Sequence, residues 1–102
     1  MPTLRDWVEE EAGGEHIEAV VIGLRYGYGP IDWEDPTRGK VLTWRKAGPI
    51  LESYDFPGSL CDPIYAWTKS WVIAVSQYDG DETPFRIPRN PADCQPIMPG
   101  GG

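Results

Sequence analysis

The sequence contains very few of the residues from which most catalytic and metal sites are built. Histidine occurs once, as His16, and cysteine occurs twice, as Cys61 and Cys94. One histidine and two distant cysteines do not provide the closely spaced ligands of a zinc site. Catalysis through a Ser-His-Asp or Cys-His arrangement would depend on His16 alone. We therefore expect no catalytic residue, no metal and no cofactor, and we interpret the protein as not being an enzyme.

Long hydrophobic runs are also missing. The longest purely apolar run covers residues 19–22, whereas a membrane-spanning helix needs about 20 apolar residues. Near the N-terminus, Asp6 stands where a signal peptide would have its apolar segment. We therefore predict a cytoplasmic protein that makes no membrane contact. In a reducing cytoplasm, Cys61 and Cys94 are expected to be two free thiols.

Positive charge is scarce, because nine Lys and Arg face sixteen Asp and Glu, which gives a net charge of −7. Direct binding to nucleic acid needs clustered cations and is not expected. Six of the acids lie in residues 1–18, where they face a single arginine. This acidic segment is either a solvated face that keeps the protein soluble or a surface that attracts a basic partner. Its candidate binding residues are Glu9, Glu10 and Glu11.

The abundant residues indicate a small, loop-rich globular protein. The 102 residues are 40% hydrophobic, which is enough for one core, and they include twelve glycines and eleven prolines. Glycine and proline are thus about twice as frequent as in an average protein. We predict a single compact domain over residues 1–91 and a Pro/Gly-rich tail over residues 92–102.

A helix is predicted at the start of the chain. Thr3 and Asp6 have the spacing of a capping box, in which each side chain binds the backbone of the other residue. Gly13-Gly14 can end the helix, since glycine readily adopts the left-handed cap conformation. The apolar residues that fall at helical spacing are Leu4, Trp7 and Val8.

Outside the middle of the chain, strands are predicted in four places. Residues 17–24 are nearly continuous in apolar character, which predicts a central strand covered on both faces. Residues 64–68 and 71–78 form a predicted hairpin. Residues 85–87 lie between two prolines, which suits a strand at the edge of a sheet.

The middle of the chain is harder to interpret. Thr43 can cap a short helix over residues 43–47, and Pro49 limits that helix to a brief turn. Residues 51–56 alternate in polarity and predict a further strand. Together these elements predict an α+β fold, in which an N-terminal helix packs on a small, mostly antiparallel sheet with a C-terminal β-meander.

The aromatic residues exceed what one small core needs. If the hairpin forms the centre of the sheet, Trp67 and Val75 should be buried. Trp33 and Trp44 do not fit the core pattern and are left for another role. The tryptophans expected in the core are Trp7, Trp67 and Trp71.

The segment from Tyr26 to Gly39 is the strongest candidate for a binding site. It is rich in glycine, proline and aromatic residues and has no periodicity, and long loops of this kind are often functional. Its aromatic side chains either pack over the sheet as a lid or project as anchors of a protein interface. The candidate partner-binding residues of this loop are Tyr26, Tyr28, Asp32, Trp33, Glu34 and Asp35.

Four segments of the chain carry a resemblance to known proteins. Residues 3–23, 65–68, 71–80 and 87–91, with the Met-Pro-Gly-Gly sequence near the end, resemble small proteins encoded by mycobacteriophages and other actinobacterial phages. The resemblance carries over no catalytic residue. It implies a setting, which is the cytoplasm of an infected actinobacterium.

These observations lead to one functional expectation and two alternatives. We expect a noncatalytic module that binds a host protein during infection and so contributes to host takeover. The first alternative is a self-associating or structural phage component, a homo-oligomer that could pair through the edge strand at residues 85–87. A small enzyme ranks third, because it would need a pocket converging on His16 or on a thiol.

Overall fold

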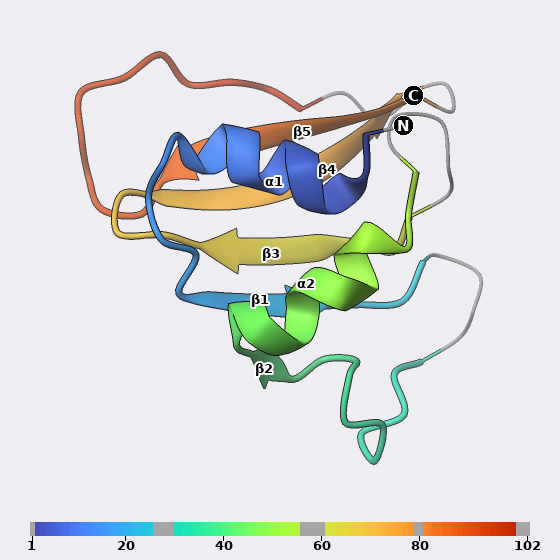
Figure 1. Cartoon of the computed structure of the whole chain (residues 1–102). Coiled ribbons are helices and arrows are strands. Elements are labelled where there is room, and N and C mark those ends of the chain that lie inside the picture. Colours follow the sequence, from blue (N-terminus) through green and yellow to red (C-terminus); the bar gives the residue numbers. More distant parts are fainter. Residues whose placement is uncertain (1, 26–29, 56–60, 79–80, 100–102) are drawn as a thin grey trace.

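Two helices lie against one face of a five-stranded sheet in the computed structural model, which describes residues 2–25, 30–55, 61–78 and 81–99 (Figure 1). The strand order is β2-β1-β3-β4-β5, and all neighbours are antiparallel. Within the described ranges, neither helix is long and apolar enough to cross a membrane. The elements are α1 (Leu4–Ala12), β1 (Ala19–Ile22), β2 (Val41–Leu42), α2 (Trp44–Glu52), β3 (Ile64–Trp67), β4 (Trp71–Tyr78) and β5 (Asp81–Pro88).

The α+β fold predicted from the sequence is confirmed, including its N-terminal helix and its C-terminal meander β3-β4-β5. The capping box forms as expected: the Thr3 backbone N–H donates to Asp6 Oδ2 at 2.8 Å, and Asp6 N–H donates to Thr3 Oγ1 at 3.3 Å. Gly13 ends the helix in the left-handed conformation, with φ of 64°. The capping box and the glycine cap therefore set the two ends of α1.

The hairpin β3–β4 and the edge position of β5 are also confirmed. The buried Thr68 closes the hairpin, because its Oγ1 accepts from Trp71 N–H at 2.9 Å and donates to Glu15 Oε1 at 2.7 Å. β5 is longer than predicted, since its pairing with β4 extends along the whole strand. After β5, Arg89 donates to the carbonyl of Thr68 and pairs with Glu18 at 2.8 Å. Residues 90–99 form no helix or strand and are exposed.

The core lies between the helices and the sheet. α1 covers β4 and β5, whereas α2 covers β1 and β2 on the same face (Figure 1). The fully buried side chains come from both layers, so helix burial and sheet burial stabilise the same core. The largest of them are Leu4, Val8, Val20, Ile22, Leu51, Thr68 and Ile73.

The prediction for residues 17–24 is wrong in three respects. The strand covers only Ala19–Ile22 and lies second from the edge. Val20 and Ile22 are fully buried beneath the helices, whereas Val21 points to the other face and is half-buried. The near-continuous apolar run therefore does not reflect cover on both faces, because one apolar face of β1 has no helix over it.

Residues 51 and 52 belong to α2, so the predicted strand 51–56 is wrong over these residues. Asp55 forms only an isolated antiparallel bridge with Thr3, and residue 56 lies outside the described residues. The Thr43 cap is confirmed by a bond from Lys46 N–H at 3.3 Å. The helix nevertheless continues through Pro49, which is exposed. Burial of Ala47 and Leu51 on one stripe maintains the helix despite the missing proline N–H.

Candidate functional site

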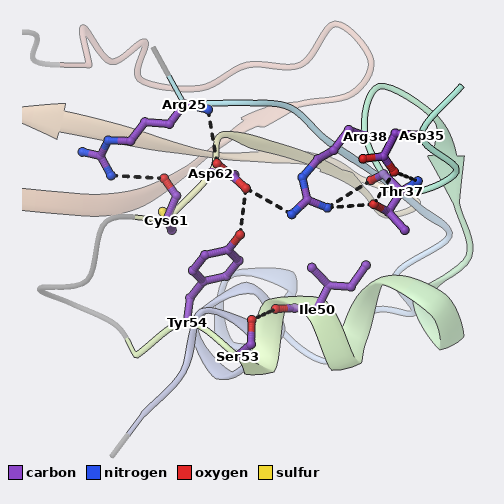
Figure 2. A network of polar contacts seen from close by, with 9 residues as sticks. All are labelled: Arg25, Asp35, Thr37, Arg38, Ile50, Ser53, Tyr54, Cys61 and Asp62. Carbon is purple, nitrogen blue, oxygen red and sulfur yellow. Dashed lines mark hydrogen bonds and ion pairs between the residues drawn. The ribbon is translucent and has the colours of Figure 1, made fainter. Parts of the chain in front are cut away.

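A polar network fixes the loop of residues 30–40 to the rest of the fold (Figure 2). Its centre is the Asp62 carboxylate, which accepts from Tyr54 Oη at 2.7 Å and lies 3.2 Å from Arg38 Nη2. The other carboxylate oxygen accepts from the backbone N–H of Arg25 at 3.2 Å. Burial, and then the hydrogen bond to the Asp62 carboxylate, raise the pKa of Tyr54 to about 12. Asp62 thus joins the loop, through Arg38, to the end of α2.

Backbone geometry fixes the same loop at a second point. Gly39 N–H donates to the Ile22 carbonyl at 2.7 Å, which attaches the loop directly to β1. Gly39 adopts φ of 70°, and an added Cβ would lie 2.9 Å from the Trp33 ring. A side chain at this position would therefore be strained and would press on Trp33.

The acidic residues of the loop separate into two roles. The Asp35 carboxylate accepts from both the backbone N–H and the hydroxyl of Thr37 at 2.7 Å, and these bonds hold the pKa of Asp35 below its usual value. Asp32 Oδ1 accepts from Glu34 N–H at 3.0 Å. Asp32 and Glu34 remain exposed. Asp35 therefore shapes the loop, whereas the other two carboxylates face solvent.

Trp33 lies on the outside of this fixed loop. Its side chain is 66% exposed, so it does not act as a lid over the sheet. The Lys40 ammonium lies 5.5 Å from the ring centroid and also donates to the Trp33 carbonyl, which orients the indole. The predicted site residues Tyr26 and Tyr28 lie outside the described residues, so their contribution stays a prediction.

The acidic residues of α1 are not next to Trp33. Glu9 and Glu10 are exposed and Glu11 is half-buried; Glu9 pairs with Arg5 at 3.2 Å. Because α1 covers β4 and β5 while the loop precedes β2 at the opposite edge of the sheet, the two groups do not form one site (Figure 1). The sequence-predicted site residues therefore divide between two separate surfaces.

A third surface was not predicted from the sequence. Strand register aligns side chains in two rows on the face of the sheet that neither of the two described helices covers. We call these two rows the helix-free face. The first row is Val41, Val21, Tyr65, Ala74 and Phe85, and the second is Ala19, Trp67, Val72 and Ile87.

The helix-free face is uncharged along both rows and partly open to solvent. Val41 is 76% exposed, Tyr65 57% and Ile87 46%. Tyr65 and Trp67 form an edge-on aromatic pair with centroids 6.1 Å apart. Trp67 is thus only half-buried and lies outside the core, contrary to prediction, and Val75 is half-buried against the core. Alternating polarity alone does not reveal which face of a strand the helices cover.

A groove of about 410 Å³ lies where the loop meets the helix-free face. The loop contributes Ile31 and Gly39, and the sheet contributes Val21, Tyr65 and Phe85 among others. Trp33 does not line this groove. The loop is therefore adjacent to the helix-free face, but its exposed Trp33 side chain is not part of the groove between them.

A hollow of about 550 Å³ lies beside Cys61, and it is also lined by Arg25 and Glu82. The Glu82 side chain is buried and accepts from Cys61 N–H and Sγ, both at 3.2 Å. Burial, followed by the bond to Glu82, raises the pKa of the Cys61 thiol to about 12. A thiol held in the protonated form is a poor nucleophile, so Cys61 is not activated for nucleophilic attack in this arrangement.

The remaining candidates for chemistry are dispersed. His16 is exposed just before β1. Cys61 and Cys94 are both free, as expected; the first is buried and the second exposed. Among the described residues, no three His, Cys, Asp or Glu side chains are grouped closely enough to hold a metal ion.

Comparison with known proteins gives no match, whether against family models, curated proteins or solved structures. The candidate site is therefore defined by its own geometry. Its clearest feature is an exposed tryptophan on a loop that is fixed at Arg38 and Gly39.

Proposed function

We propose that this protein is a noncatalytic protein-binding module, encoded by an actinobacterial phage, that binds a host protein in the host cytoplasm during infection. The observation that carries the proposal is the 66% exposure of Trp33 on a loop with fixed geometry. Tryptophan is among the residues most enriched at the energetic centres of protein interfaces. A large exposed indole at the surface of a small acidic protein fits a role as an anchor.

The fixed geometry of the loop favours affinity for a partner, in addition to positioning the Trp33 side chain. Ordering a flexible loop at an interface costs free energy that would otherwise contribute to binding. Here the Arg38–Asp62 ion pair and the bond from Gly39 N–H to Ile22 order residues near Trp33 before any partner binds. The indole can therefore enter a pocket on a partner with little further loss of entropy.

The exposed carboxylates on either side of Trp33 in the sequence indicate the chemistry of the partner. Asp32 and Glu34 are exposed on either side of the indole in the sequence. A fitting partner presents an apolar pocket bordered by Lys or Arg side chains, because such a rim complements the two carboxylates. The acidic face of α1 attracts the same kind of partner at longer range, without contacting it.

A noncatalytic role is supported by the state of the groups that could react. The Cys61 thiol is buried and has a raised pKa. His16 is exposed, and the hydrogen-bond partner of Cys61 is the Glu82 carboxylate rather than this histidine. The phage setting is supported by the resemblance of the sequence segments described above.

The proposal is tested by capture from a lysate of an actinobacterial host. Wild type, Trp33→Ala and Met98→Ala are immobilised, and captured proteins are quantified by mass spectrometry. Met98 is the matched control, since it is an exposed apolar residue in the tail at 95% exposure. We expect a host protein that wild type and Met98→Ala retain and that Trp33→Ala loses by about tenfold or more, as for a hot-spot residue.

Two further measurements complete the test. Thermal unfolding of Trp33→Ala should remain close to wild type, because an exposed side chain contributes little to stability. Asp32→Asn with Glu34→Gln should weaken capture and reduce its salt sensitivity. Identical captured proteins from wild type and Trp33→Ala would overturn the assignment of the anchor.

A further inference from the structure

The helix-free face is an apolar surface of the sheet that neither helix covers. In proteins, a sheet normally buries each apolar face against another layer. Here both helices cover the other face (Figure 1), while Val41, Tyr65 and Ile87 remain about half exposed or more. These three residues lie on three different strands, so the exposed surface spans the sheet.

The charges of the molecule restrict which surfaces of two copies can meet. Each copy carries a net charge of −7, and like charges brought together at an interface oppose association. The exposed acids Glu9 and Glu10 lie on the helical layer, whereas the two rows of the helix-free face contain no charged side chain. Stacking through the helix-free face places the acidic helices on the two outer sides, as far apart as possible.

The edges of the sheet are poorly suited to association. Proline cannot donate to the ladder with β4, so the backbone nitrogens of Pro84 and Pro88 face the open edge of β5 without a hydrogen. A strand added at this edge would lack two backbone N–H donors to pair with. The opposite edge is β2, which is only two residues long. The edge pairing considered from the sequence at residues 85–87 is therefore disfavoured.

The size of the face is sufficient for a weak dimer. Given the usual strand spacing and rise per residue, the five strands present a surface of roughly 400 Å² per copy. Two stacked copies would bury about 800 Å² in total, which is below the size of a stable specific interface and in the range of weak, transient ones. An interface this small is typical of weak, transient association rather than of an obligate dimer.

We propose that two copies of this chain stack their helix-free faces to form a symmetric homodimer. The product has four layers, with helices outside and two sheets inside about 10 Å apart. Tyr65 lies near the middle of the first row and becomes buried, together with the edge residue Val41. Trp33 is not part of either row, so the dimer and the proposed host-binding loop use different side chains.

The proposal is tested by sedimentation equilibrium of the whole chain between about 1 and 500 μM, a range that covers micromolar association. Wild type should shift from 11.4 kDa towards twice that mass. Tyr65→Lys should remain monomeric at all concentrations. Met98→Lys is the matched control, because it adds the same charge at an exposed apolar residue outside the face, and it should dimerise like wild type.

A second variant tests the proposal in case Tyr65→Lys does not fold. Val41→Lys changes a side chain that is already 76% exposed, so it should fold normally and still weaken the dimer by about tenfold or more. A monomeric wild type, or a Tyr65→Lys dimer of unchanged affinity, would overturn the proposal. A continuous rise in mass beyond the dimer would also overturn it, because that result indicates open-ended edge pairing.

The two proposals fail separately. Trp33→Ala should dimerise normally even where it loses the host protein. A monomeric wild type that still captures a host protein through Trp33 would exclude the dimer and leave the binding proposal intact. A wild-type dimer that captures no host protein through Trp33 would exclude the binding proposal and leave the dimer intact.

Discussion

The Arg38 guanidinium lies 3.2 Å from the Asp62 carboxylate, and less than one fifth of either side chain is exposed. This ion pair joins the loop that carries Trp33 to the network around Tyr54 (Figure 2). The loop that carries Trp33 is therefore held by a pair of charges that are largely buried.

We predict that Asp62→Asn lowers the free energy of unfolding by about 2–4 kcal/mol, because it leaves the Arg38 charge without its partner. Urea denaturation gives the value. Glu9→Gln is the control, since it breaks the exposed pair with Arg5 and should cost less than about 1 kcal/mol. Equal effects of the two substitutions would show that the Arg38–Asp62 pair does not secure the loop.

Gly39 has a steric role that can be separated from backbone strain. Gly39→Ala places a Cβ 2.9 Å from the Trp33 ring at φ of 70°, and we expect a loss of about 1–3 kcal/mol together with weaker capture of the host protein. Gly14→Ala is the control, because Gly14 has φ of 90° and no atom within 4 Å of the added Cβ. It should lose stability through strain alone and keep full capture. Loss of capture by both variants would contradict this role for Gly39.

The two thiols should differ in reactivity. Cys94 is exposed, whereas Cys61 is buried and has its pKa raised to about 12. In native protein at pH 8, a thiol reagent should modify one group rapidly, and the second only after unfolding. Cys94→Ser should remove the fast reaction. Two groups of equal rate in the native protein would show that Cys61 is not protected.

Stability should fall at alkaline pH. The pKa of Cys61 rises from 9.0 to about 12 on folding, and that of Tyr54 from 10.0 to about 12. The unfolded chain therefore loses these protons first, so the stabilisation present below pH 9 is lost as pH rises towards 12. Urea denaturation between pH 8 and 11 measures this slope. Tyr54→Phe with Cys61→Ala should flatten it, and an unchanged slope would assign the pH dependence to other groups.

Local patterns predicted those parts of the fold that depend on local chemistry. The capping box at Thr3 and the hairpin around Thr68 are determined within a few residues, and both were predicted. The helix through Pro49 was not, because it depends on burial against distant elements. The two-residue strand β2 is too short to give any periodic pattern.

The candidate site was only partly predictable for the same reason. The absence of periodicity around Trp33 correctly separated it from the core residues. The pairing of Arg38 with Asp62 leaves no trace in the sequence, because the two residues meet only through the tertiary fold. Trp67 was expected in the core, since its alternation with neighbours is the same whichever face the helices cover.

The most direct test of the binding proposal is a photo-crosslink from position 33 in a living actinobacterial host. Trp33 is replaced by a photoreactive phenylalanine derivative, and a second protein carries the same group in place of Met98. We predict a discrete crosslinked host protein from position 33 that is absent from position 98. No crosslink from position 33, or the same crosslinked proteins from both positions, would contradict the assignment of Trp33 as the anchor of a host-protein interface.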